Sequence, residues 1–161
     1  MGNGAPRDGS AMDDDDLEDG ASVVDEETGL ANRRGFMEIL RMEERRHARY
    51  GGSPILVLVD VGQAVALRPA EDRVNLLIEV ADVIADAMRD TDTIARVDDN
   101  RFGILAIQAG CSGSSILGRL RLQLELRRIS QADITLGEEG SLIASWRALE
   151  GSTKPTLRLV R

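Results

Sequence analysis

The spacing of apolar positions predicts two long helices separated by a buried strand. Phe36, Ile39 and Leu40 share one face of the first helix, which Asn32 caps and Gly51-Gly52 ends. The next segment, 54–60, is almost continuously apolar and predicts a buried strand that ends on the carboxylate of Asp60. The second helix runs from residue 71 to 88. Its expected core-facing stripe consists of Val74, Leu77, Ile78, Ala81, Ile84, Ala85 and Met88.

The second half of the chain has shorter periodic segments. Two apolar stretches joined by Asp98-Asp99-Asn100 predict a β-hairpin. Residues 110–115 lack the Gly-Lys-Ser/Thr ending of a phosphate-binding loop and predict a connector, which a third helix over 116–129 follows. Three strands are expected afterwards, over 134–136, 142–149 and 156–160, the last two forming a closing hairpin around Gly151-Ser152. The whole pattern favours an α/β domain with a central, mostly antiparallel sheet flanked by helices.

Charge is distributed unevenly along the 161 residues. Residues 1–27 contain ten acidic residues and one basic residue, whereas residues 28–161 contain eighteen acidic and nineteen basic residues. Residues 1–24 are also rich in Gly and Ser and poor in apolar side chains, so they cannot bury enough surface to offset chain entropy. We therefore expect a disordered acidic arm over 1–24 and one folded domain over 25–161. The arm is either a solubilising tail or a competitor for a basic surface.

Several classes of protein are disfavoured by the composition. The single Cys111 cannot form an internal disulfide, which suits a reducing cytosol. We see no apolar signal segment near the N-terminus and no run long enough to cross a bilayer, so a cytoplasmic protein without membrane contact is expected. Basic residues are not interleaved with aromatic residues, so nucleic-acid binding is not indicated.

Three stretches resemble the GGDEF family, the bacterial diguanylate cyclases. Residues 25–36, Asp-Glu-Glu-Thr-Gly-Leu-Ala-Asn-Arg-Arg-Gly-Phe, resemble the family's Asp-x-Leu-Thr-Gly-Leu-x-Asn-Arg-Arg-x-x-Phe entry, with Glu27 in place of the first Leu. Asp60 matches the first, metal-binding Asp of the family's Asp-x-Asp-x-Phe-Lys motif. Residues 89–102 keep the frame Arg-x-x-Asp, five residues, and a signature ending in Phe102. The resemblance implies a palm-type cyclase core, here with a shortened C-terminus.

The catalytic letters of this family are replaced. Asp98, Asp99, Asn100 and Arg101 stand where the resemblance places Gly-Gly-Asp/Glu-Glu. Catalysis there needs carboxylates for two metal ions and glycines that let backbone approach a triphosphate. The segment that reads guanine is also shortened and lacks the family's letters. The interpretation is therefore a catalytically inactive domain without a cofactor, in which Asp60 is a vestige of the metal site.

The resemblance implies a ligand site at Arg89 and Asp92. In active members of the family, Arg-x-x-Asp upstream of the turn is the inhibitory site for the product, cyclic di-GMP. A planar guanidinium suits guanine O6/N7 or phosphate, and a carboxylate complements guanine N–H groups. Arg-x-x-Asp is a weak motif by itself, because Arg96–Asp99 matches it too. The alternative is a local ion pair that closes the preceding helix.

These observations leave three functional hypotheses. The first is a cyclic di-GMP receptor that acts through Arg89 and Asp92, in which a bridging ligand favours a homodimer or a protein partner. The second is a nucleotide-independent interaction module on an inactive cyclase fold. The third is an enzyme of new specificity that uses Asp60, Asp98 and Asp99 as metal ligands.

Overall fold

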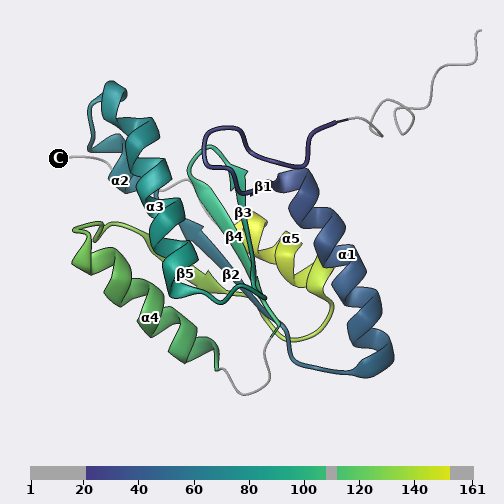
Figure 1. The fold of residues 1–161 in the computed structure, drawn as a ribbon. Helices are drawn as coiled ribbons and strands as arrows, with labels where there is room; N and C mark the ends of the chain where they lie inside the picture. The colour runs from purple at the N-terminus through teal and green to yellow at the C-terminus, as the bar shows by residue number, and fades with distance from the viewer. Residues whose placement is uncertain (1–20, 108–111, 153–161) are drawn as a thin grey trace, which may run out of the picture.

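A five-stranded mixed sheet forms the centre of the computed structural model, which describes residues 21–107 and 112–152. The strands lie in the order β1-β3-β4-β2-β5, and helices cover both faces (Figure 1). Every adjacent pair is antiparallel except β1 with β3. The strands are β1 (Ala31–Asn32), β2 (Ile55–Asp60), β3 (Thr93–Asp98), β4 (Arg101–Ala106) and β5 (Asp133–Leu136). The expected α/β fold with a mostly antiparallel sheet is confirmed.

The first face of the sheet is covered by α1 (Arg33–Tyr50) and α5 (Leu142–Ser152). The predicted N-cap of α1 is confirmed, because the Asn32 side chain accepts a hydrogen bond of 2.9 Å from the backbone N–H of Gly35. The helix ends at Gly51, whose φ of 71° is accessible to glycine at little cost. Its Phe36 packs edge-on against Trp146 of α5, with ring centroids 4.8 Å apart.

The opposite face is covered by α3 (Arg73–Ala87) and α4 (Gly113–Leu126), with the short α2 (Gly62–Ala66) and the 3₁₀ turn η1 (Ala70–Asp72) before α3. The predicted stripe of α3 is only partly correct. Val74, Ile78 and Ala85 are exposed. The buried face is instead rotated, because α3 packs against both the sheet and α4, and consists of Leu76, Leu77, Val80, Ala81, Val83, Ile84 and Ala87.

The predicted strand over 142–149 and its closing hairpin are wrong, because this stretch is the helix α5. Leu142, Ser145, Trp146 and Leu149 are buried at the i, i+3, i+4, i+7 spacing of a helix face. Ser141 precedes it and its hydroxyl accepts from Ala144 N at 3.3 Å. The strand predicted over 156–160 lies outside the described residues. None of the described helices combines the length and the apolar character needed to cross a membrane.

The first described residues are attached to the domain. Asn32 N donates to Val23 O at 2.9 Å, and its side chain donates to Ser22 O at 2.7 Å. Val24 forms an isolated antiparallel bridge with Ala31. Residues 22–24, which we placed in the acidic arm, thus bond to the start of α1, and residues 1–20 lie outside the described part.

Candidate functional site

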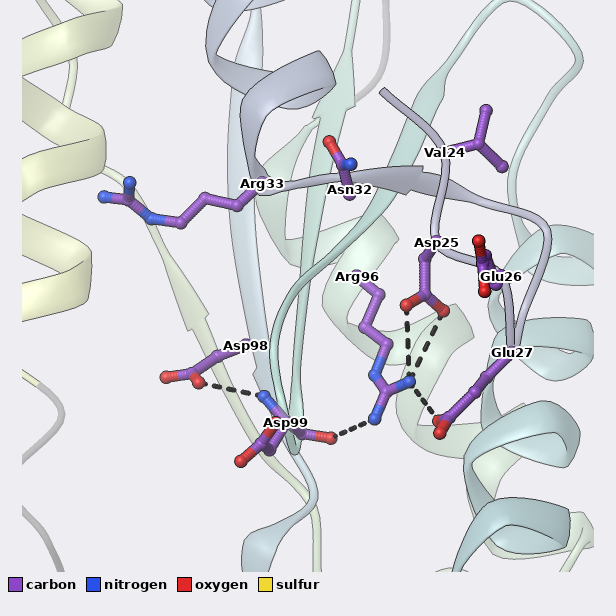
Figure 2. Close-up of a pocket in the computed structure, with 9 residues that line it drawn as sticks. All are labelled: Val24, Asp25, Glu26, Glu27, Asn32, Arg33, Arg96, Asp98 and Asp99. Carbon is purple, nitrogen blue, oxygen red and sulfur yellow. Dashed lines mark hydrogen bonds and ion pairs between the residues drawn. The ribbon is translucent and has the colours of Figure 1, made fainter. Parts of the chain in front are cut away.

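Three segments meet at the turn end of the β3–β4 hairpin: the end of β2, the hairpin turn itself and the turn that starts at Asp25. A shallow depression of about 580 Å³ lies between the last two of these, the hairpin turn and the turn that starts at Asp25. It is lined mainly by two acidic runs, Asp25–Glu27 and Asp98–Asp99, together with Arg33 and Arg96 (Figure 2). The parallel pairing of β1 with β3 explains this assembly, because it places Asn32 beside Arg96 and draws the entry turn to the hairpin.

Asp60 is engaged by the chain itself. One carboxylate oxygen, Oδ1, accepts from Gly62 N at 2.8 Å, and the other, Oδ2, accepts from Arg101 Nε at 3.1 Å. The register of β2 and β4 causes the second contact, since it places Asp60 directly opposite Arg101. Both carboxylate oxygens of Asp60 are therefore bonded within the chain, one of them to a guanidinium.

Residues 98–101 form a tight turn with hydrogen bonds to its own residues and to the chain after β2. Asp99 N donates to Asp98 Oδ1 at 2.9 Å, and Asn100 O accepts from Val61 N at 2.9 Å. Arg101 Nη1 also lies 4.0 Å from Asp98 Oδ2, so this cation stands between Asp60 and Asp98. Phe102, the retained last letter, is fully buried in the aliphatic core beneath α3 and α4.

The hypothesis of a metal site at Asp60, Asp98 and Asp99 is not supported by this geometry. Two magnesium ions, which the fold family implies, need several anionic oxygens on one side. Here both oxygens of Asp60 are bonded, and Arg101 adds a positive charge beside them. Within residues 21–107 and 112–152, no group of three His, Cys, Asp or Glu residues is placed to hold a metal ion. These residues do not fit the ions.

Arg96 joins the entry turn to the hairpin, a role that the sequence analysis missed. Its side chain, 11% exposed, forms ion pairs with Asp25 at 3.4 Å and with Glu27, and it donates to Asp99 O at 2.9 Å. Figure 2 shows its guanidinium between these groups. Burial lowers the pKa of Arg96, but the hydrogen bond that it donates to Glu27 and the charges of Asp25 and Glu27 raise that pKa above its ordinary value overall.

Asp25 is fixed by its own turn as well as by Arg96. Its Oδ2 accepts from Thr28 Oγ1 at 2.6 Å and from Thr28 N at 3.0 Å. Burial raises the pKa of Asp25. The hydrogen bonds from Thr28 and the charge of Arg96 together lower this pKa by more, so the net pKa is below its ordinary value. The Thr-Gly turn of the sequence thus has a structural purpose. It presents a carboxylate to β3.

Arg33 forms a two-pronged contact with α5 and points away from Arg96 (Figure 2). Its Nε and Nη2 donate to the two carboxylate oxygens of Glu150, each at 2.9 Å. This hydrogen bonding raises the pKa of Arg33 despite the opposing effect of burial. The contact ties the first turn of α1 to the last turns of α5.

Arg89 and Asp92 lie together, but not at the depression. They precede β3, whose six residues span roughly 20 Å and separate them from the hairpin turn. Asp92 Oδ2 accepts from Arg89 N at 3.0 Å, and Asp92 N donates to Arg89 O at 2.9 Å. The contact is therefore a turn closed through the backbone, instead of the side-chain ion pair considered as the alternative.

The two residues differ in how accessible they are. Arg89 is exposed, which leaves its guanidinium open to solvent. Asp92 is half-buried, and its second oxygen, Oδ1, is buried without a hydrogen-bond partner among the described residues. Of the two predicted site residues, Arg89 is thus the one that reaches solvent, and Asp92 holds the turn in shape.

Comparison with known proteins identifies first the class of the fold and then the group of solved structures that share it. No protein-family model and no curated protein matches the chain. Solved structures do match, and they place this mixed sheet with its flanking helices in the palm-like α/β class. More closely, the structures matched are GGDEF domains at a probability of 1.00, and this chain has a GGDEF-like fold.

Three of these structures illustrate the match. The GGDEF domain of DgcB from Caulobacter crescentus, in complex with c-di-GMP, is 16% identical with a TM-score of 0.67, over 81% of this chain and 87% of that one. The FimX GGDEF domain from Pseudomonas aeruginosa is 16% identical with a TM-score of 0.63, over 79% and 88%. Diguanylate cyclase SiaD from Pseudomonas aeruginosa, in complex with its activator SiaC, is 24% identical with a TM-score of 0.61, over 84% of this chain and 62% of SiaD.

Proposed function

We propose that this chain is a non-catalytic GGDEF-type signalling domain that binds cyclic di-GMP through Arg89, in a turn held by Asp92. The observation that carries the receptor role is this turn, in which Asp92 accepts from the backbone N–H of Arg89 and so holds the backbone that presents an exposed guanidinium at the end of α3. A guanidinium carried on an already ordered backbone loses less conformational freedom on binding a guanine edge or a phosphate than one on a mobile loop. The complex of DgcB with c-di-GMP supports the choice of ligand.

The loss of catalysis is supported by the ion pair between Asp60 and Arg101. A cyclase needs metal ions to activate a hydroxyl and to stabilise charge on phosphate. In this chain the cation at Asp60 is Arg101, which cannot supply a bound hydroxide or several open coordination positions. Asp98 and Asp99 also add negative side chains where triphosphate would have to approach.

Turnover of GTP tests this part of the proposal. We expect no cyclic di-GMP or pyrophosphate when the full chain is incubated with GTP and Mg²⁺ or Mn²⁺. Arg101→Ala removes the cation at Asp60 but leaves Asp98 and Asp99, so we expect no turnover from this variant either. Metal-dependent product formation by the unaltered chain would show that the domain is an enzyme.

Residue-resolved titration tests the division of roles between Arg89 and Asp92. On addition of cyclic di-GMP, we expect amide chemical-shift changes to centre on residues 88–93. Asp92→Asn keeps a side-chain oxygen that can accept from Arg89 N, so binding should weaken less than in Asp92→Ala, where the turn loses this bond. Equal binding by the two variants and the unaltered chain would show that Asp92 does not contribute to the site.

A second candidate is an interaction module that needs no nucleotide. It is favoured by Asp92, because both of its oxygens are turned away from a ligand, one bonded to Arg89 N and one buried. A guanine would then lack the carboxylate that complements its N–H groups. The complex of SiaD with its activator supports a protein partner. Light scattering of the full chain with and without cyclic di-GMP distinguishes a ligand-induced homodimer from a module that does not respond.

A further inference from the structure

The outward side of α1 carries a row of arginines. Arg34, Arg41, Arg45 and Arg49, which we call the arginine row, follow one another at spacings of seven, four and four residues and so share one side of the helix. The opposite side, with Phe36 and Leu40, is buried against the sheet and α5. Figure 1 shows α1 on the outer side of the molecule, and Arg41, Arg45 and Arg49 are exposed, whereas Arg34 is partly covered.

Three charges of this row are not compensated within the fold. Arg41, Arg45 and Arg49 are exposed, and their side chains form no ion pair or hydrogen bond with the part of the chain that the structure describes. The acidic residues of the helix are committed elsewhere: Glu38 pairs with Arg34, Glu43 with Arg46, and Glu44 with Ser141. Like charges four residues apart disfavour a helix, so an anionic segment on this face would stabilise α1.

An anionic segment of matching length belongs to the same chain. Residues 13–19 contain six acidic side chains: Asp13, Asp14, Asp15, Asp16, Glu18 and Asp19. The described chain begins at Ala21, whose carbonyl oxygen accepts from Arg34 Nη1 at 3.4 Å. The acidic segment is therefore tethered at the first arginine of the row.

The reach of the acidic segment matches the length of the arginine row. At a rise of 1.5 Å per residue, Arg41 and Arg49 lie about 10 Å and about 22 Å along the axis from Arg34. In an extended chain at roughly 3.3 Å per residue, Asp19 and Asp13 reach about 7 Å and about 26 Å from Ala21. The acidic segment can thus cover the row from end to end. A short tether also gives it a local concentration on the order of millimolar, which a free competitor must overcome.

We propose that residues 13–19 bind along the arginine row of α1, so that this face is occupied by the chain's own acidic segment. The contact is electrostatic and exposed, so it weakens with salt. It covers a cationic face that would otherwise attract polyanions. It does not depend on the nucleotide-binding proposal, because neither Arg89 nor Asp92 takes part.

Paramagnetic relaxation in the full chain tests the contact. A nitroxide is attached at Ser10→Cys in a Cys111→Ser background, and backbone amide intensities are compared with those of the reduced, diamagnetic label. At about 50 mM salt we expect the amides of residues 41–49 to lose at least half of their intensity, while those of α4 keep theirs. At about 1 M salt, where the screening length is roughly 3 Å, the α1 intensities should return.

Two sets of substitutions distinguish binding to the arginine row from a general effect of positive charge. Arg41→Gln, Arg45→Gln and Arg49→Gln together should restore the α1 intensities at low salt. Arg68→Gln, Arg121→Gln and Arg127→Gln together remove the same charge from exposed positions of the opposite layer and should leave the α1 loss unchanged. Full α1 intensities in the labelled parent, equal losses over α1 and α4, or an unchanged loss in the row variant would each overturn the proposal.

Discussion

Arg96 is the single side chain on which the geometry of the site depends most. It is nearly buried, and it contacts two carboxylates from the entry turn and one backbone carbonyl from the hairpin turn. Hydrogen bonds to charged groups contribute more than neutral ones, and a partly buried carboxylate that loses one of its partners adds a further cost. Arg101, on the other side of the hairpin turn, forms an ion pair with the carboxylate of Asp60 on the adjacent strand.

Replacement of Arg96 by Gln should therefore destabilise the domain by about 1.5–3 kcal/mol, because it removes a charge-assisted bond and leaves Asp25 unpaired. Urea-induced unfolding of the full chain measures this change. Arg121→Gln, at an exposed position of α4, is the matched control and should change stability by less than about 0.5 kcal/mol. Equal effects of the two substitutions would show that Arg96 does not join the two turns.

Asp25 predicts a dependence of stability on pH. Its pKa in the folded state is below the ordinary value of 3.8, so its contribution is fully present above pH 3.8 and is lost as pH falls through the folded-state pKa. Unfolding free energies measured between about pH 6 and about pH 2 should fall less steeply in Asp25→Asn than in the parent. Identical slopes below pH 3.8 would contradict the lowered pKa.

At the scale of elements, a close approach between β4 and the α1–α5 layer sets a steric limit. A Cβ on Gly103 would lie 2.8 Å from the ring of Phe36 and 2.9 Å from that of Trp146. Gly103→Ala should therefore destabilise the domain by about 1–3 kcal/mol through overpacking. The opposite sign is expected for Gly118→Ala in α4, where a Cβ meets nothing within 4 Å and helix propensity gains about 0.5–1 kcal/mol. Thermal unfolding of both variants checks the pair, and a stabilised Gly103→Ala would contradict this packing.

Some elements could be predicted from sequence and others could not, for local reasons. The hairpin and the limits of α1 follow from residues with one conformational preference, such as Asn32 and Gly51. The run from Leu142 to Leu149 is short and apolar, and such a run fits a strand or a helix until its packing against α1 decides. In α3, periodicity predicted an apolar face, but packing against α4 decides which residues of the helix are buried.

The site likewise contains features that local sequence indicates and features that depend on the pairing of distant strands. The substitutions at Asp98–Arg101 were readable from the frame of the motif, and the cross-strand register then explains why Arg101 meets Asp60. The ion pair between Asp25 and Arg96 joins residues 71 positions apart and depends on the parallel pairing of β1 with β3, which no local pattern indicates. The backbone contact of Asp92 was likewise outside what spacing could show.

At the scale of the molecule, the two ends of the β3–β4 hairpin have different chemistry. The turn end is closed by the chain's own ion pairs, at Asp60–Arg101 and around Arg96. The other end presents the exposed Arg89 beside the end of α3. The proposed function, nucleotide binding without conversion, rests on this difference between the two ends.

Calorimetric titration of cyclic di-GMP into the full chain tests this account most directly, with Arg89→Ala and Arg121→Ala measured beside it. Both replaced arginines are exposed, and Arg121 lies on α4. We expect micromolar or tighter binding by the parent and by Arg121→Ala, and at least a tenfold loss, about 1.4 kcal/mol, in Arg89→Ala. Absence of binding by the parent, or equal affinity in all three proteins, would contradict a receptor that acts through Arg89.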